Sequence, residues 1–356
     1  RPRCVDAAAP LGVTMTQRRR WMLALLGTTV PLAAVPVAAQ ELNLYSSRHY
    51  DTDERLYSQF EEQTGITINR IEGKADELIA RIEAEGANSP ADVLLTVDAG
   101  RLWRADEAGL LQPVNSDVLA ERIPAELRHP DGHWFGFSTR ARIIYYDKGS
   151  IDPELVQTYA DLARPELEGE VCIRSSSNIY NLSLMAALIE HLGAEAAEEW
   201  AAGVVENFAR DPQGGDTDQI RAIAAGACGV SLGNHYYFAR LMRSEDPADR
   251  EVVDAVGWVF PNQDGRGTHI NVSGAGVVAD APNPEAAVAF LEYLASDEAQ
   301  RWLANGNNEY AVVEGVELDN PALQELGDFE ADDLDVSVLG RNQTQAQILF
   351  DRAGWE

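Results

Sequence analysis

The sequence has little positive charge and almost no lysine. Its 356 residues include 28 Lys+Arg against 58 Asp+Glu, a formal net charge of −30, and lysine stands only at positions 74 and 148. A nucleic-acid phosphate backbone would be repelled by such a chain, so nucleic-acid binding is excluded as its main function. Low hydrophobicity combined with high charge is typical of disordered chains, but here 45% of the residues are hydrophobic. That share is ordinary for a folded globular protein.

Long apolar runs and the common cofactor motifs are also missing. The chain contains no Walker loop, no dinucleotide-binding fingerprint and no zinc motif. Beyond residue 39, no segment approaches eighteen consecutive apolar residues, so we expect no membrane-spanning helix there. The length suits one large or two medium domains.

The first 39 residues have the pattern of a secretory signal peptide. Three arginines at 18–20 precede an apolar stretch, 21–39, that two prolines interrupt, and Val37-Ala38-Ala39 offers the small residues of a cleavage site. The basic run fits a twin-arginine export signal and an ordinary secretory signal alike. Residues 1–14 precede Met15 and are read as a product of start-site choice. We expect an exported protein.

Cysteine is scarce, and the three residues divide unevenly. Cys4 lies in the leader, which leaves Cys172 and Cys228, each in a short β-like stretch. In an oxidising compartment an even pair favours a disulfide. Two buried free thiols are the alternative.

Strands that alternate with helices predict an α/β protein of two units with parallel strand pairing. In the first unit, Asp51 and Glu54 predict a capping box, and Gly65 predicts the end of that helix. The second unit includes strands 169–174, 228–232 and 254–259, and helices 180–191, 194–207, 216–226, 234–243 and 340–353. The segments 140–146 and 271–279 are predicted to cross between the units. We expect two lobes, 40–139 with 260–319 and 140–259 with 320–356, joined by hinge strands around a ligand cleft.

Tyrosines stand where strands lead into helices. Tyr236 and Tyr237 open a helix after the apolar strand 228–232, with Asn234 as the expected N-cap. Tyr180 opens another helix in the corresponding position, and Tyr50, preceded by His49, does so in the first unit. Because the carboxyl ends of such strands meet at one cleft, we expect these side chains to converge.

The chemistry of this set suggests a metal site. Arg240 follows Tyr236 by four residues, and a neighbouring cation favours the phenolate form of tyrosine. Phenolate and imidazole ligands suit a hard, highly charged cation such as ferric iron. The alternative is that the tyrosines are rim residues that pack their rings and hydrogen-bond their hydroxyl groups.

Two other motifs compete with this interpretation. Gly229-Val230-Ser231-Leu232-Gly233 matches the G-x-S-x-G pattern of serine hydrolases, but Ser231 falls inside the apolar run rather than at a turn, which favours a chance match. His129-Pro130-Asp131-Gly132-His133 resembles a metal pair, but without a third ligand nearby it is read as a turn.

From Leu44-Tyr45-Ser46-Ser47-Arg48-His49-Tyr50 onward, the chain resembles the periplasmic ferric-iron-binding proteins of bacterial ABC uptake systems, especially their cyanobacterial-type branch. The matching stretches span nearly the whole chain after the leader: 71–78, 88–95, 134–137, Arg174-Ser175-Ser176-Ser177-Asn178, Tyr236-Tyr237 and Gly265-Arg266-Gly267-Thr268-His269. The resemblance implies a monomeric two-lobed "Venus flytrap" that delivers iron to an ABC permease of the inner membrane and is not an enzyme.

The resemblance also implies a ligand set. Tyr50 from the first lobe and Tyr180, Tyr236 and Tyr237 from the second would bind the iron. His49 stands where related proteins place a histidine that binds directly in some cases only, and Arg240 and Arg140 match arginines near the tyrosinates. Ferrous binding and an additional anion stay open. The remaining alternatives are a binder of the same fold for an organic or oxyanion ligand, and a secreted serine hydrolase that uses Ser231.

Overall fold

A computed structural model of the protein describes residues 40–48 and 50–356. The predicted signal peptide, 1–39, and His49 lie outside the described residues. The strands belong to one mixed sheet: β1 (Glu41–Ser46), β2 (Thr67–Glu72), β3 (Val93–Val97), β4 (Leu111–Gln112), β5 (Phe135–Asp147), β6 (Val171–Cys172), β7 (Val230–Asn234), β8 (Val256–Val259), β9 (Ile270–Val278) and β10 (Tyr310–Ala311).

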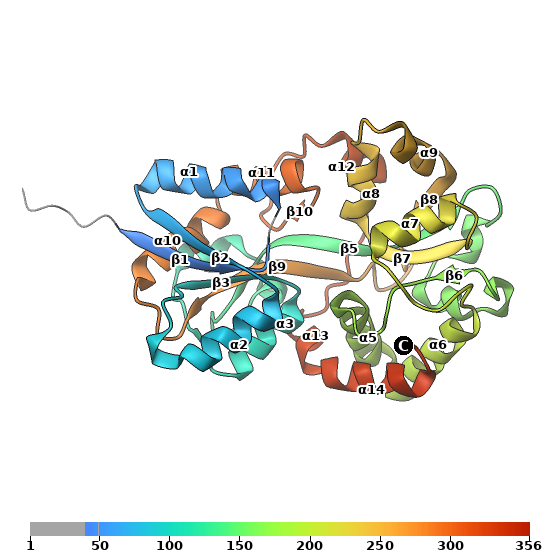
Figure 1. Ribbon diagram of the computed structural model, residues 1–356, viewed down its shortest axis with the longest axis horizontal. Coiled ribbons are helices and arrows are strands. Elements are labelled where there is room, and N and C mark those ends of the chain that lie inside the picture. Colours follow the sequence, from blue (N-terminus) through green and yellow to red (C-terminus); the bar gives the residue numbers. More distant parts are fainter. Residues whose placement is uncertain (1–39, 49) are drawn as a thin grey trace, which may run out of the picture. The chain divides into compact units, whose positions relative to one another are not determined.

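Helices cover the sheet on both faces, as Figure 1 shows. They are α1 (Glu54–Thr64), α2 (Ala75–Glu85), α3 (Ala99–Glu107), α4 (Asp117–Arg122), α5 (Ile179–Leu192), α6 (Ala194–Glu206), α7 (Asp216–Ala224), α8 (His235–Met242), α9 (Pro247–Ala255), α10 (Pro284–Leu294), α11 (Asp297–Asn307), α12 (Pro321–Leu326), α13 (Ser337–Arg341) and α14 (Gln343–Ala353). No helix in the described part is long and apolar enough to cross a membrane.

The long strand β5 joins the two halves of the sheet (Figure 1). Its first part, up to Ala141, pairs with β9, and its second part, from Arg142, pairs with β7 and β8. Parallel pairing is confirmed where a helix connects the strands, for β1 with β2 and β3 and for β6 with β7. The predicted crossing segments 140–146 and 271–279 lie in β5 and β9, which run antiparallel to their neighbours. These two strands bring the chain back across the sheet instead of extending a βαβ unit.

The apolar core divides between the two ends of β5. One cluster packs β1, β3 and β9 against α1 and α10, with Phe60 and Phe290 at ring centroids 5.1 Å apart. The other end holds two clusters, in which Trp355 after α14 packs against Trp200 of α6 at 6.0 Å. Two packed centres linked by crossing strands are the mixed α/β, two-lobed arrangement that the sequence predicts.

Several local predictions need correction. The strand 169–174 is reduced to β6, and the strand 254–259 begins only at Val256, after α9. The predicted helix 340–353 is divided into two helices at Asn342. The side-chain amide of Asn342 donates a hydrogen bond to the carbonyl of Ala186 at 3.2 Å.

Two predicted caps are also replaced by tertiary contacts. Residues Asp51–Asp53 form a 3-10 turn, η1, without a side-chain cap, and Asp53 instead pairs with Arg48. Asn234 occupies the N-cap position of α8 but makes no cap bond, because its Oδ1 accepts from Arg142 at 3.2 Å. Gly65 does end α1, with a left-handed φ of 72°.

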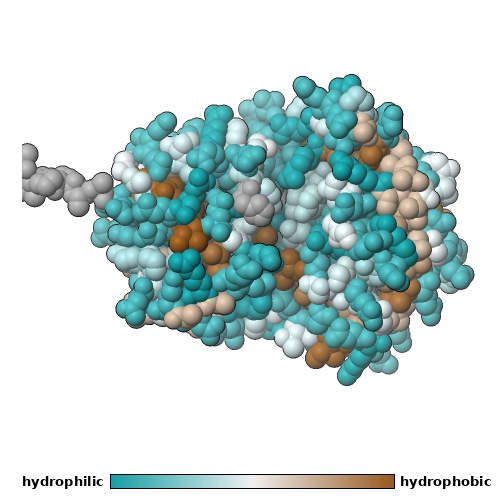
Figure 2. All heavy atoms as spheres, in the orientation of Figure 1, coloured by the Kyte–Doolittle hydropathy of each residue, from teal (hydrophilic) through white to brown (hydrophobic). Residues whose placement is uncertain are grey.

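The face seen in Figure 2 is mostly hydrophilic, with small separate hydrophobic patches. Among the residues that the structure describes, the exposed large apolar side chains are Val118, Leu192 and Ile348, which lie on three different helices. Single exposed apolar residues of this kind are normal for a folded protein.

Candidate metal centre

Four tyrosines come together near the middle of β5. The phenol oxygens of Tyr236 and Tyr180 lie 3.3 Å apart, and the rings of Tyr236 and Tyr237 have centroids 4.3 Å apart. The guanidinium of Arg240 lies 5.8 Å from the ring centroids of Tyr50 and Tyr237 and 5.9 Å from that of Tyr236. We call Tyr50, Tyr180, Tyr236 and Tyr237 the tyrosine cluster.

Local structure places each tyrosine at the start of a helix. Tyr50 has extended backbone angles and leads into η1, and Tyr180 is the second residue of α5, where the Asn178 side chain accepts from its backbone N–H at 3.0 Å. Tyr236 and Tyr237 lie in the first turn of α8, directly after β7. The positive end of a helix dipole favours an anionic ligand group at these positions.

Buried charges lie behind one side of the tyrosine cluster. Glu309 accepts from Arg48 at 3.0 Å and from Arg140 at 2.9 Å, and Arg48 also pairs with Asp53 at 2.9 Å. The side chains of these four residues, the Glu309 cluster, are at most 2% exposed. Arg48 lies 5.0 Å from the Tyr50 ring and Arg140 lies 5.6 Å from the Tyr236 ring. Two tyrosines therefore face buried cations.

A second group of charges supports Tyr180. Asp216 accepts from Arg142 at 3.2 Å and from Arg174 at 3.0 Å, and both guanidinium groups lie within 6.0 Å of the Tyr180 ring. We call Arg142, Arg174 and Asp216 the Asp216 cluster. Arg174 is 18% exposed, so this cluster is less completely closed.

Several of these buried arginine N–H groups are unused. Nε and Nη1 of Arg140, Nε of Arg142 and Nε of Arg174 have no hydrogen-bond partner among the described residues. Buried donors without acceptors cost free energy, and each belongs to a guanidinium that lies over a ring of the tyrosine cluster. A negatively charged group at the phenol oxygens would supply acceptors.

The environment keeps Tyr50, Tyr236 and Tyr237 protonated when no cation is bound. Burial, together with Tyr180 and Tyr50, raises the pKa of Tyr236 well above its ordinary value, although Arg140 opposes the rise. Burial likewise raises the pKa of Tyr50 against the effect of Arg140 and Arg48, and it raises the pKa of Tyr237. By contrast, Glu309 is kept ionised: burial acts to raise its pKa, but Arg48 and Arg140 outweigh that effect and lower it. These phenols are therefore neutral until a bound cation displaces their protons and makes them negatively charged.

An open cavity adjoins the tyrosine cluster and provides access to it. It measures about 690 Å³ and is lined by Tyr50, Tyr180 and Tyr237 together with three cations, Lys74, Arg101 and Arg240. Tyr50 and Tyr237 also line a second opening of about 810 Å³. The tyrosine cluster therefore lies between two openings that a small ion or its chelate can enter.

Comparisons with known proteins agree with this geometry. The family model for bacterial extracellular solute-binding proteins matches residues 88–329. The chain belongs to this family. It is 54% identical to iron uptake protein A1 of Synechocystis over 92% of this chain and 90% of the relative.

Solved structures give the same picture. The Trichodesmium protein IdiA (FutA), in complex with iron and citrate ligands, superposes with a TM-score of 0.86 at 57% identity, covering 89% of this chain and 100% of the other. A ferric binding protein from Campylobacter jejuni superposes with a TM-score of 0.84 at 42% identity, over 88% and 100% of the two chains. These matches confirm the resemblance to ferric-iron-binding proteins and the two-lobed fold. Membership of a solute-binding family also agrees with the prediction that the chain is not an enzyme.

The serine-hydrolase alternative finds no support in this solute-binding protein. Ser231 lies inside β7, is 0% exposed, and donates to the carbonyl of Leu232 at 3.3 Å. The flanking glycines have packing roles, since a Cβ at Gly229 would lie 2.5 Å from the Glu170 carboxylate and one at Gly233 would lie 2.8 Å from the Tyr145 ring. A catalytic serine has to reach its substrate, and this one does not.

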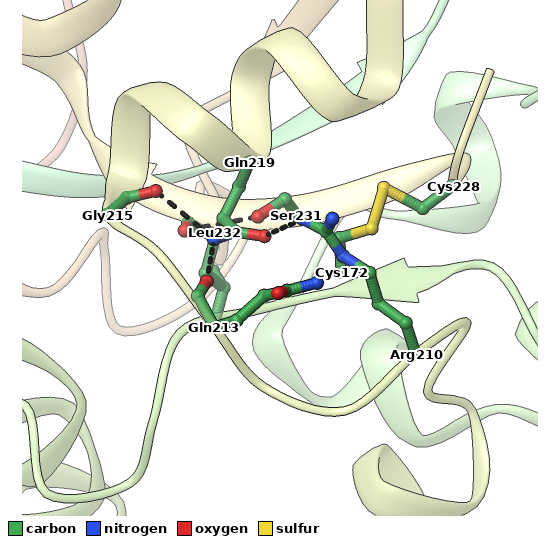
Figure 3. The surroundings of a disulfide bond; sticks show 8 residues. All are labelled: Cys172, Arg210, Gln213, Gly215, Gln219, Cys228, Ser231 and Leu232. Carbon is green, nitrogen blue, oxygen red and sulfur yellow. Dashed lines mark hydrogen bonds between the residues drawn. A yellow bond between two sulfur atoms is a disulfide. The ribbon is translucent and has the colours of Figure 1, made fainter. Parts of the chain in front are cut away.

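Cys172 and Cys228 form a disulfide in the structure, with Cα atoms 5.8 Å apart. Figure 3 shows the bond beside Ser231, which pairs with Cys172 across β6 and β7, and beside Gln219 of α7. Gln219 accepts from Arg210 at 2.9 Å and donates to the carbonyl of Gly215 at 3.1 Å. The bond thus links the end of β6 to the loop between α7 and β7.

The structure also adds residues that sequence reasoning did not single out. Arg48, Glu309 and Asp216 organise the charges around the tyrosines, as described above. One signal was readable: Arg140 and Arg142 are the only charged residues between Phe135 and Tyr146 of this strand. Arginine is rarely buried without a carboxylate partner, so this pattern indicates paired acids elsewhere in the chain.

Proposed function

We propose that this protein is the periplasmic ferric-iron-binding component of an ABC uptake transporter, and that Tyr50, Tyr180, Tyr236 and Tyr237 bind the iron as tyrosinates. The observation that carries the proposal is the convergence of four tyrosines whose rings each lie within 6.0 Å of an arginine guanidinium. The arginines beside two of them, Tyr180 and Tyr236, also have unused buried N–H groups. Ferric iron has the charge to displace phenol protons, and the phenolates would then accept from those arginines. Arg140 and Arg240 act next to the tyrosines and are not ligands.

The proposed site draws on both sides of β5, which suits a transport role. Tyr50 follows β1, whereas the other three tyrosines belong to α5 and α8. Full coordination would therefore need both lobes in place, and a permease could recognise that closed form. The lobe boundaries at 139/140, 259/260 and 319/320, a monomeric state, and export by the twin-arginine rather than the general secretory route remain predictions.

A visible absorption titration tests the ligand assignment. Purified iron-free protein receives ferric nitrilotriacetate, and a saturable tyrosinate-to-iron charge-transfer band at one iron per chain is expected. Tyr236→Phe and Tyr237→Phe should each weaken binding by at least about tenfold. The matched control is Tyr293→Phe. Tyr293 is a buried phenol outside the tyrosine cluster, and it packs on Phe60 in the apolar cluster around β1, β3 and β9.

The same titration ranks His49, whose ligand role remains a prediction. His49→Ala should cost less affinity than loss of Tyr236 or Tyr237, and equal losses would contradict the proposed ranking. Because each tyrosinate releases a proton as iron binds, the apparent affinity should also fall as the pH is lowered.

An anion binder of the same fold is the second candidate. In the lining of one cavity the cations Lys74, Arg101 and Arg240 outnumber the carboxylates Glu72 and Asp76. This balance of charge would suit an oxyanion or organic acid. Under that candidate, added ferric iron gives no colour, and citrate or phosphate binds to the iron-free protein. A colourless titration would favour the anion and would leave the two-lobed fold unaffected.

A further inference from the structure

Two histidines and a carboxylate converge outside the tyrosine cluster. Nε2 of His129 lies 3.2 Å from Oδ2 of Asp106, and Nδ1 of His133 contacts Oδ1 of the same carboxylate. One ligand atom from each of the three residues lies within 4.8 Å of the others. His133 was expected to form only a turn with His129, for want of a third ligand. That interpretation was incomplete, because α3 supplies Asp106 from 23 residues earlier in the sequence than His129.

The backbone holds these residues in place. Asp106 stands in the last turn of α3, and the loop from His129 to His133 is closed by a bond of 3.0 Å from the N–H of Gly132 to the carbonyl of His129. Gly132 has a φ of 76°, and a Cβ there would lie 2.6 Å from the carbonyl oxygen of Val114. The tight turn therefore depends on glycine, and it presents both imidazoles to one helix end.

The arrangement also has the exposure of a binding site. The side chains of Asp106, His129 and His133 are 11%, 16% and 27% exposed, so they are held by the fold yet open to solvent. None of them lines the cavities beside the tyrosine cluster within the described residues. Asp106 lies roughly 10 Å along α3 from Ala99, at the end away from those cavities.

We propose that Asp106, His129 and His133 bind a divalent transition metal, with Zn²⁺ the best fit, at a site separate from the tyrosine cluster. Two imidazoles and one carboxylate are a common zinc ligand set, and water would fill the open fourth position. In a tetrahedral site with bonds of about 2.0–2.1 Å, neighbouring ligand atoms lie roughly 3.3 Å apart, close to the 3.2 Å between His129 and Asp106.

Binding would require small local changes. The rings of His129 and His133 stack at 4.7 Å with an angle of 11° between them, so they would tilt toward the ion. Nδ1 of His129 now accepts from the N–H of Asp131 at 3.1 Å, and that bond would open when Nε2 binds a metal and Nδ1 takes the proton. The site is thus ordered but not closed, which predicts moderate rather than very tight affinity.

Titration of the untagged, iron-free protein with Zn²⁺ and with Co²⁺ tests the proposal. Calorimetry should show one Zn²⁺ bound per chain at this site, and Co²⁺ should give the visible bands of a tetrahedral complex. His129→Gln, His133→Gln and Asp106→Asn should each weaken binding by at least about tenfold. The matched control is His191→Gln, because His191 pairs with Asp332 at 2.7 Å without belonging to a three-ligand group in the described residues.

The outcomes separate this site from the tyrosine cluster. Binding that survives in Tyr236→Phe but is lost in His133→Gln supports the proposal, whatever the iron titration gives. No binding to the unmodified protein overturns the proposal, as does an equal loss in His191→Gln. In either of these cases the two histidines simply donate hydrogen bonds to Asp106.

A measurement on the unmodified protein guards against variants that fail to fold. Zn²⁺ should slow the modification of His129 and His133 by diethylpyrocarbonate, followed by mass spectrometry, and should leave His191 unprotected. Equal modification with and without Zn²⁺ would overturn the proposal.

Discussion

The Glu309 cluster and the Asp216 cluster both neutralise buried arginines beside tyrosines, but they differ in how far their side chains are shielded from solvent. Each places one carboxylate between two arginines that face tyrosines. The Glu309 cluster joins residues up to 261 positions apart and is at most 2% exposed. The Asp216 cluster joins residues at most 74 positions apart through its ion pairs, and Arg174 is partly open to solvent. The difference teaches that the charge behind Tyr50 and Tyr236 depends on the whole fold, whereas the charge behind Tyr180 is more local.

The largest expected effect is on the Glu309 side. Glu309→Gln leaves Arg48 and Arg140 buried without their shared carboxylate, so the free energy of unfolding should fall by about 3–5 kcal/mol. Asp216→Asn should cost less, because Arg174 can turn toward water. Urea unfolding of the iron-free proteins measures both, with Glu314→Gln at an exposed position as control. An equal or larger loss in Asp216→Asn would break the comparison.

The disulfide lies on the Asp216 side of the molecule. It closes a loop with a sequence separation of 56, and its removal in Cys172→Ala/Cys228→Ala should lower the free energy of unfolding by about 2–4 kcal/mol. Reduction of the native protein should have the same effect and should leave the double variant unchanged. If reduction did not shift the unfolding midpoint, the bond would contribute no stability.

Acid should first affect the buried histidines on both sides. Burial lowers the pKa of His235, which lies near Glu309 and Arg140, to about 4, and the shift is larger for His269. Burial, with Arg142 nearby, lowers the pKa of His269 to about 3 from an ordinary value of 6.5. The unfolded chain therefore binds the extra proton more readily between these values, so this stability is complete above pH 6.5 and is lost as the pH falls toward 3, by about 2 kcal/mol near pH 5. Glu309, whose pKa lies below its ordinary value of 4.5, should lose its contribution only at lower pH.

His269→Gln isolates that contribution. Thermal melts of the variant should depend less on pH between about 6.5 and 4.5 than melts of the native protein. His133→Gln provides the control, because His133 is a half-buried histidine that is not among the groups that shift the pKa of His269. Parallel curves for the native protein and His269→Gln would assign the acid sensitivity to other groups.

The smallest effect on stability is expected at Arg240. It is exposed and touches three tyrosine rings, so Arg240→Gln should change the free energy of unfolding by no more than about 0.5 kcal/mol. If the proposed iron site is right, the same variant should weaken ferric binding, because a cation that favours the phenolates is lost. If the charge-transfer titration gives an unchanged affinity, Arg240 does not stabilise the tyrosinates, and only the Glu309 cluster and the Asp216 cluster can do so.

Much of the candidate site was readable in the sequence. Tyr180, Tyr236 and Tyr237 follow predicted strands and begin predicted helices, and the topology of an α/β protein then places them at one cleft. Arg240 is one helical turn from Tyr236, so its position also follows from local spacing. The positions of these side chains therefore follow from the local spacing of residues along the chain.

Other residues could not be located in this way. Glu309 follows the end of α11 with no local feature that separates it from the many acidic residues of the chain. It meets Arg48 and Arg140 because β1, β5, β9 and β10 are brought together in one sheet. Asp106 likewise joins His129 and His133 only through the packing of α3.

The sequence by itself determined which segments become strands and helices and which of them carry tyrosine at their junctions, because periodicity and helix starts are local properties of the chain. The tertiary structure alone decided which carboxylates neutralise the buried arginines. It also decided that η1 and α8 begin without the predicted side-chain caps, and that α13 and α14 are separate helices. Desolvation explains the difference. A buried charge must find its partner wherever the fold brings one close, and that contact outweighs the local preferences of the residues involved.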